Sequence, residues 1–130
     1  MLQSSAYYFI NLQLPRAIDN MRYRFRDKPI IYGIRCRVTG KMYIGSTFVP
    51  QDRFYKHLIA RDPLRSSPEL QDDITRYGLE SITVHIFEVV KFPKDMHIAN
   101  RKDHLRSIEQ SYLDRWPKHK RYNANASYTW

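Results

Sequence analysis

The stretch PIIYGIRCRVTGKMYIGST, at residues 29–47, constrains the fold more than any other part of the chain. It contains two runs rich in β-branched and aromatic residues, IIYGIRCRV and KMYIGS, on either side of Thr39-Gly40. Residues of these types pack well on a pleated surface, and two such runs separated by a glycine turn are typical of a β-hairpin. The sequence therefore predicts two antiparallel strands here.

The spacing of the two tyrosines in this hairpin determines whether they share a face. If the turn contains two residues, Cys36 pairs with Tyr43. Tyr32 precedes Cys36 by an even number of residues, so both tyrosine side chains then project from the same side of the sheet. A register shift of one residue would separate them. Tyrosine is an ordinary strand residue, so a role beyond packing needs support from elsewhere in the chain.

The rest of the chain alternates between helix and strand patterns. Pro50 suits the first turn of a helix through QDRFYKHLIA. A capping pattern, Ser66-x-x-Glu69, begins a second helix that Gly78 ends. SITVHIFEVV alternates as a third strand, and a long helix is predicted over residues 96–116. The order is β-β-α-α-β-α, and the predicted fold class is α/β (α+β), a small three-stranded, antiparallel-type mixed sheet flanked by helices.

The length of 130 residues suits a single domain with its own core. We expect a basic N-terminal arm at residues 1–27, a domain at 28–126 and a C-terminal tail at 127–130. The arm ends in MRYRFR, in which three arginines alternate with other residues, two of them aromatic. Two interpretations of the arm remain open. It is a segment that contacts nucleic acid, which we favour, or an organelle-targeting segment.

The charge of the chain indicates the kind of partner. There are 22 Lys and Arg against 13 Asp and Glu, a formal net charge of +9. Such an excess favours a polyanionic partner, nucleic acid before membrane. No apolar run approaches the roughly 20 residues that span a bilayer, so we expect no membrane partner. The expected nucleic-acid contacts are Arg22, Arg24, Arg26, Lys41, Arg65, Lys118, Lys120 and Arg121.

Glu109 interrupts the apolar side of the last predicted helix, between Leu105 and Tyr112. One interpretation is a structural carboxylate paired with a lysine or arginine. The other follows from Arg53 and His57, which share a helix face, together with the two hairpin tyrosines. A carboxylate can hold Mg²⁺, an arginine can bind a phosphate oxygen, and tyrosine or histidine can transfer a proton. These groups together favour a phosphodiester-cleaving site.

The order and spacing of these residues resemble the GIY-YIG nuclease superfamily, best known from homing endonucleases of mobile introns. IIY at 30–32 is followed, after ten residues, by YIG at 43–45. R-x-x-x-H then follows at Arg53 and His57. A YIG triplet alone carries no weight, whereas the ordered set is specific.

The resemblance extends through the second half of the chain and covers residues 30 to about 126. SSPELQDDITRYGLESITVHIFE resembles the family's middle region, and EQSYLDRW resembles its glutamate helix, beginning at Glu109. YN at Tyr122-Asn123 resembles its closing signature. Two positions depart from the family pattern. Ile30 replaces the first glycine of the motif, and Arg65 stands where many intron-encoded members have a second histidine.

The resemblance implies a role for each matching residue. The tyrosines would line the catalytic face and one would help to activate water, while the arginine would bind the scissile phosphate. The histidine would transfer a proton or contact phosphate, and the asparagine would support the site. The glutamate would hold Mg²⁺ or another divalent cation. The implied catalytic residues are Tyr32, Tyr43, Arg53, His57, Glu109 and Asn123, with Glu109 as the metal ligand.

Two functions follow from the sequence, and both remain open. The first is a divalent-metal-dependent endonuclease acting on DNA or RNA. The alternative is a catalytically silent GIY-YIG-type domain that binds RNA as a structural component of a large ribonucleoprotein complex, such as an organellar ribosome. A protein-interaction module explains the charge less well. The location is expected to be intracellular, with a mitochondrion or another organelle open.

Overall fold

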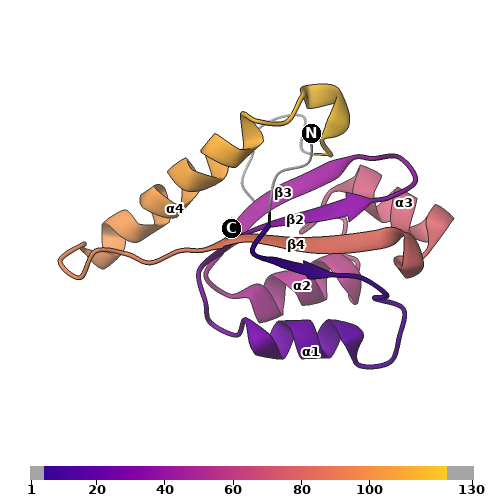
Figure 1. The fold of residues 1–130 in the computed structure, drawn as a ribbon, viewed down its shortest axis with the longest axis horizontal. Coiled ribbons are helices and arrows are strands. Elements are labelled where there is room, and N and C mark those ends of the chain that lie inside the picture. Colours follow the sequence, from indigo (N-terminus) through magenta and orange to yellow (C-terminus); the bar gives the residue numbers. More distant parts are fainter. Residues whose placement is uncertain (1–4, 123–130) are drawn as a thin grey trace.

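A computed structural model describes residues 5–122, which form one sheet with helices on both faces (Figure 1). The strands lie in the order β1-β4-β2-β3, and every pairing between them is antiparallel. The class is therefore α+β, but the described residues form four strands rather than the predicted three, and the sheet is not mixed. The elements are β1 (Tyr7–Phe9), α1 (Ala17–Arg24), β2 (Ile30–Cys36), β3 (Met42–Thr47), α2 (Pro50–Leu58), α3 (Pro68–Tyr77), β4 (Ile82–Val89) and α4 (Ile98–Leu113), with 3₁₀ turns at Leu79–Ser81 and Lys118–Lys120.

The hairpin of β2 and β3 has a longer turn than the two residues considered in the sequence. The backbone N–H of Cys36 donates to the carbonyl of Lys41 (3.1 Å), so the four residues between them form the loop. Ile34, rather than Cys36, therefore lies opposite Tyr43. The register differs from the expected one by two residues. Because an even shift leaves every side chain on its predicted face, Tyr32 and Tyr43 still share one side of the sheet.

Alternation along the strands divides the core into two layers. Ile30 faces the first layer, which α1, α2 and α3 cover, and Ile31 faces the second, which α4 covers (Figure 1). Phe54 of α2 and Leu70 of α3 are fully buried in the first layer. The second layer contains Met42, Ile44, Phe87, Val90, Leu105, Tyr112 and Leu113.

Helix α4 is shorter than the predicted helix over residues 96–116, because it begins at Ile98 and ends at Leu113. Ile98, the first residue of the helix, is exposed. The first turns of α4 extend beyond the sheet (Figure 1). Leu105 and Glu109, further along, are buried. Within residues 5–122, no helix combines the length and the apolar character needed to cross a bilayer.

Much of the predicted basic arm lies against the sheet. Strand β1 pairs with β4, and α1 packs against α2. Leu12, Ile18, Met21 and Phe25 are buried in the first layer of the core. These apolar side chains come from a segment that also carries the predicted arginines, so the hydrophobic core extends to the N-terminal side of residue 28.

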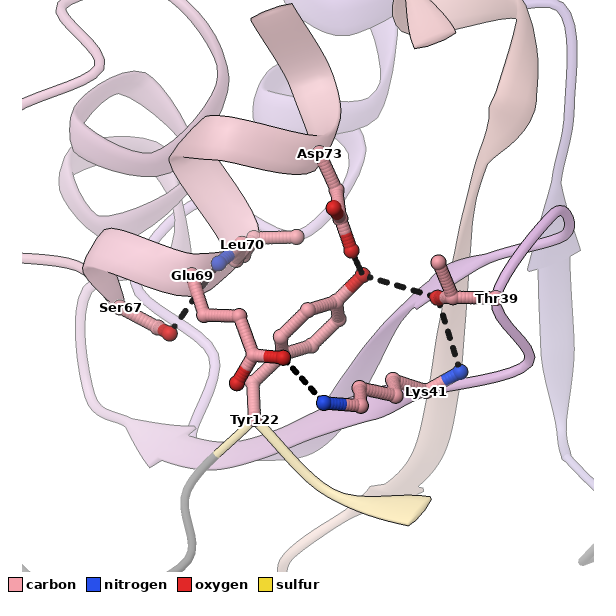
Figure 2. Close-up of polar contacts among 7 residues, drawn as sticks. All are labelled: Thr39, Lys41, Ser67, Glu69, Leu70, Asp73 and Tyr122. Atoms are coloured by element: carbon pink, nitrogen blue, oxygen red, sulfur yellow. Dashed lines mark hydrogen bonds and ion pairs between the residues drawn. The ribbon is translucent and has the colours of Figure 1, made fainter. Parts of the chain in front are cut away.

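Tyr122 ties the last described segment to the hairpin loop and to α3 (Figure 2). Its hydroxyl donates to Asp73 Oδ2 (2.6 Å) and lies 3.3 Å from Thr39 Oγ1. Burial and the Asp73 carboxylate raise the pKa of Tyr122, so the phenol keeps the proton that it donates. Asn123, predicted to support the site, and the predicted tail at 127–130 lie outside the described residues.

Candidate active site

Tyr32 and Tyr43 lie side by side on the inner face of the hairpin, with ring centroids 6.3 Å apart. Gly45 pairs with Tyr32 across the two strands, and a Cβ at Gly45 would lie 2.6 Å from the Tyr32 hydroxyl oxygen. Only glycine leaves this space, so the last residue of YIG lets the Tyr32 ring cross β3. Burial, and then the neighbouring Tyr43, raise the pKa of Tyr32, which therefore holds its proton at neutral pH.

Helix α2 presents Arg53 and His57 on its buried face, as their spacing predicts. The Nη2 atom of Arg53 donates to the backbone carbonyl of Arg65 (3.0 Å), which anchors the guanidinium beside the hairpin. Burial lowers the pKa of Arg53, but the phenols of Tyr32 and Tyr43 raise it by more. The guanidinium therefore stays charged next to both tyrosines.

His57 lies beneath the tyrosines and is fully buried. Its Nε2 atom is 2.9 Å from the Tyr32 hydroxyl oxygen, and its Nδ1 atom is 2.7 Å from Ser66 Oγ. Burial, and then the positive charge of Arg53, lower the pKa of His57 to about 3. The imidazole is therefore neutral at physiological pH, and each ring nitrogen has a hydroxyl neighbour.

Glu109 reaches the same region from the opposite face of the sheet. Ser46 Oγ donates to Glu109 Oε1 (2.6 Å), and the Glu109 side chain is buried. Burial raises the pKa of Glu109 to about 7, against the opposing effects of the Ser46 hydrogen bond and of Arg106. The two faces meet here because β3 is an edge strand. Ser46 was not predicted as a site residue. It lies three residues after Tyr43 in β3, and because side chains alternate along a strand, this odd spacing places Ser46 on the face opposite Tyr43, which α4 covers.

A pocket of about 170 Å³ lies at this edge. Four of the six implied catalytic residues line it: Tyr32, Tyr43, Arg53 and Glu109. Lys56 and Arg65 add positive charge to the lining, and Phe48 adds an aromatic ring. His57 is not among the lining residues, so it contacts the pocket through Tyr32 rather than directly.

Ser66 is a second residue that the sequence interpretation missed. The predicted cap at Ser66 is wrong by one residue. Ser67 caps α3, because its Oγ accepts the backbone N–H of Leu70 (3.2 Å; Figure 2). The Ser66 hydroxyl is thereby left to contact His57. The available sequence signal was the Ser66-Ser67 pair. A helix has one Ncap position, so only one of the two serines can cap α3 and the other is available for a different contact.

The predicted nucleic-acid contacts divide into engaged and exposed side chains. Arg22 donates to a backbone carbonyl of α2 (2.7 Å), and Lys41 forms an ion pair with Glu69 (Figure 2). Arg121 is buried and donates to the carbonyl of Leu113 (3.2 Å). These three cations therefore have structural partners. Five other residues are exposed: Arg24, Arg26, Arg65, Lys118 and Lys120. Of these, Arg24 lies over the Tyr7 ring (4.6 Å to its centroid) and Arg26 lies 3.9 Å from the Asp27 carboxylate.

Ile30, which replaces the first motif glycine, is fully buried in the first core layer. It lies opposite Thr47 on one side and Val89 on the other, and it does not line the pocket. The β-branched side chain therefore fills the core behind the site.

Two carboxylates are the possible cation ligands at the pocket. Glu109 and Asp52 are the carboxylates of its lining, and Asp52 also pairs with Lys56 (2.9 Å). Residues 5–122 contain no group of three or more His, Cys, Asp or Glu side chains that could hold a metal ion. Mg²⁺ binds through one or two carboxylates and completes its shell with water and phosphate oxygens. Glu109 fits this pattern, whereas a structural zinc site needs more protein ligands.

Comparison of the chain with family models, with curated proteins and with solved structures found no match. Any assignment of function therefore depends on the residues of this chain and on their geometry.

Proposed function

We propose that this protein is a GIY-YIG-type endonuclease that hydrolyses phosphodiester bonds of nucleic acid. The observation that supports this most is the composition of the pocket at β3. Two phenols, two arginines, one lysine and two carboxylates line it, and one of the carboxylates, Glu109, comes from the opposite face of the sheet. A purely structural carboxylate or arginine needs one partner, whereas this arrangement gathers groups of complementary chemistry around a small cavity.

Each group has a place in the hydrolysis of a phosphodiester. Water forms a new bond to phosphorus and releases a proton to the solvent, the bond to the leaving oxygen breaks, and that oxygen takes up a proton. Arg53 binds a non-bridging phosphate oxygen and stabilises the developing negative charge, since it is held beside the pocket and remains charged. Tyr32 and Tyr43 present O–H donors to a phosphate oxygen or to the leaving oxygen. Glu109 would hold Mg²⁺, which supplies charge stabilisation at the phosphate when bound.

The test is nicking of supercoiled plasmid, and of structured RNA, by the purified protein with Mg²⁺ and with EDTA. Glu109→Gln keeps the shape of the side chain and an acceptor for Ser46, but removes the charge that binds metal. We expect cleavage that requires Mg²⁺ and falls by roughly 100-fold or more in Glu109→Gln. Asp103→Asn, on an exposed residue of the same helix, is the matched control. Equal cleavage by wild type and Glu109→Gln would refute the proposal.

A second candidate is a catalytically silent RNA-binding component of a ribonucleoprotein. One observation favours it. Glu109 is buried with its pKa raised to about 7, so it is partly protonated at neutral pH in the absence of metal. This candidate predicts no cleavage in the nicking assay. In a separate binding measurement, it predicts salt-sensitive RNA binding that Glu109→Gln leaves unchanged.

A further inference from the structure

A line of hydrogen-bonded polar side chains, buried along most of its length, leads away from the pocket beneath the tyrosines. It runs from Arg61, after α2, through Gln71 of α3 and Ser66 to His57, and ends at the Tyr32 hydroxyl. Ser66, Gln71 and His57 are all buried. Among these five residues, only Tyr32 lines the pocket.

The orientation of the Gln71 amide follows from its two outer partners. Arg61 Nε can only donate, and it lies 3.0 Å from Gln71 Oε1, so this oxygen is the acceptor. At the other end, Gln71 Nε2 is 2.8 Å from the backbone carbonyl of His57, which can only accept. The amide nitrogen must therefore also donate to Ser66 Oγ, at 3.0 Å. A flipped amide would lose both outer hydrogen bonds.

The direction at Ser66 follows in turn. Its oxygen already accepts from Gln71, and its own proton needs an acceptor. Among the described residues, His57 Nδ1 is the one remaining polar neighbour of this hydroxyl, at 2.7 Å. Ser66 therefore donates to Nδ1, which must be the bare nitrogen of the neutral ring. The ring proton then lies on Nε2, 2.9 Å from the Tyr32 oxygen.

We propose that Ser66 and Gln71 are positioning residues, which hold His57 in its Nε2–H tautomer so that it donates a hydrogen bond to the Tyr32 hydroxyl oxygen. The functional part of this inference rests on the proposed nuclease activity. All four hydrogen bonds between Arg61 and Tyr32 point toward Tyr32. Successive donors of this kind polarise one another.

The consequence for Tyr32 concerns its own proton. Because the oxygen accepts from His57, the hydroxyl proton is not used in that contact and is directed to the pocket that Tyr32 lines. Tyr32 then presents O–H to a phosphate or leaving oxygen, and a hydrogen bond into its oxygen makes it a better proton donor. With the reverse tautomer, Tyr32 would donate its proton to His57 instead.

The tautomer can be measured without any activity, by long-range ¹H–¹⁵N correlation spectra of the ¹⁵N-labelled protein at neutral pH. His57→Asn identifies the His57 signals among those of the five histidines. We expect the proton on Nε2 in the wild type and in Ser66→Thr, which keeps the hydroxyl. A wild-type proton on Nδ1 would overturn the inference even if no variant folds.

Gln71→Glu is the sharpest variant, because a carboxylate keeps the contact with Arg61, loses the hydrogen bond to the His57 carbonyl and can only accept from Ser66, which reverses the line of hydrogen bonds. We expect the His57 proton to move to Nδ1 and cleavage to fall by roughly 100-fold, with nucleic-acid affinity unchanged. Ser67→Ala, which removes the adjacent α3 cap, should leave the tautomer as it is. A reversed tautomer with full cleavage would refute the role at Tyr32. If the wild type does not cleave, only the proposed function is refuted, because the spectra test the tautomer independently.

Discussion

Glu109 lies in surroundings that disfavour the charged form of its carboxylate. Burial raises the pKa of Glu109 to about 7, which means that the folded protein holds this carboxylate where its charged form is unfavourable. The Ser46 hydroxyl offsets part of that burial. A fold under selection for stability alone would place an apolar residue in this helix position, as at Leu105 one turn earlier.

We expect this effect of burial to appear in the pH dependence of unfolding. The pKa of Glu109 rises from 4.5 when unfolded to about 7 when folded, so the folded state binds the proton more tightly. Its contribution to stability is therefore full below pH 4.5 and is lost as pH rises toward 7. Glu109→Gln should remove this dependence and gain up to about 3 kcal/mol at pH 8.

Urea unfolding of both proteins at pH 5 and pH 8, with EDTA present, measures this difference. Asp103→Asn, at an exposed position of α4, controls for the loss of a charge from the helix. If Glu109→Gln is no more stable than the wild type at pH 8, the carboxylate is better solvated than its burial indicates.

At the scale of elements, α1 shows how a basic segment can also be a structural one. Its inward side carries Ile18 and Met21, and its outward side carries Tyr23 and Arg24. The segment before it adds β1 to the free edge of β4. The two together cover part of the first core layer, so removal of residues 1–27 would expose apolar surface and leave the edge of β4 that faces away from β2 unpaired.

A pair of single substitutions in α1 tests this structural role. Met21 is 1% exposed and Tyr23 is 78% exposed, and the two lie two residues apart. Met21→Ala should lower the free energy of unfolding by about 2–5 kcal/mol, because it leaves a cavity against the core. Tyr23→Ala should change it by less than about 0.5 kcal/mol. Equal effects in denaturant titrations would mean that α1 is not packed as described.

At the scale of the whole molecule, the net charge is +9, but the basic side chains that produce it are not all equally accessible to a polyanion. Lys41 and Arg121 are engaged with a carboxylate and a backbone carbonyl, whereas Lys118 and Lys120 lie on exposed residues. A polyanion that contacts the molecule outside the pocket is expected to use the exposed cations first. Contacts of this kind release counterions, so they determine how steeply binding weakens with salt.

The corresponding measurement is fluorescence anisotropy of a labelled duplex between roughly 50 and 200 mM salt. The double variant Lys118→Ala/Lys120→Ala should weaken binding at low salt and reduce the slope of log K against log salt by about 0.9 for each lost phosphate contact. Lys41→Ala, whose ammonium pairs with Glu69, should leave the slope unchanged. A double variant with the wild-type slope would place the nucleic acid elsewhere on the surface.

The local pattern of the sequence was sufficient for the hairpin, the third strand of the prediction and the helices that carry Arg53 and Glu109. It also placed Tyr32 and Tyr43 on one face, although the turn and the register differed from those considered. The reason is physical. A strand repeats every two residues and a helix every 3.6, so periodicity alone assigns a side chain to a face, and an even shift of register does not change it.

Only the tertiary structure assigned the contacts between segments far apart in the chain. It placed β1 beside β4, left Ser66 for His57 by capping α3 with Ser67, and brought Ser46 to Glu109 around an edge strand. None of these follows from periodicity, because each depends on how the helices pack on the sheet and on which buried polar groups remain to be satisfied there.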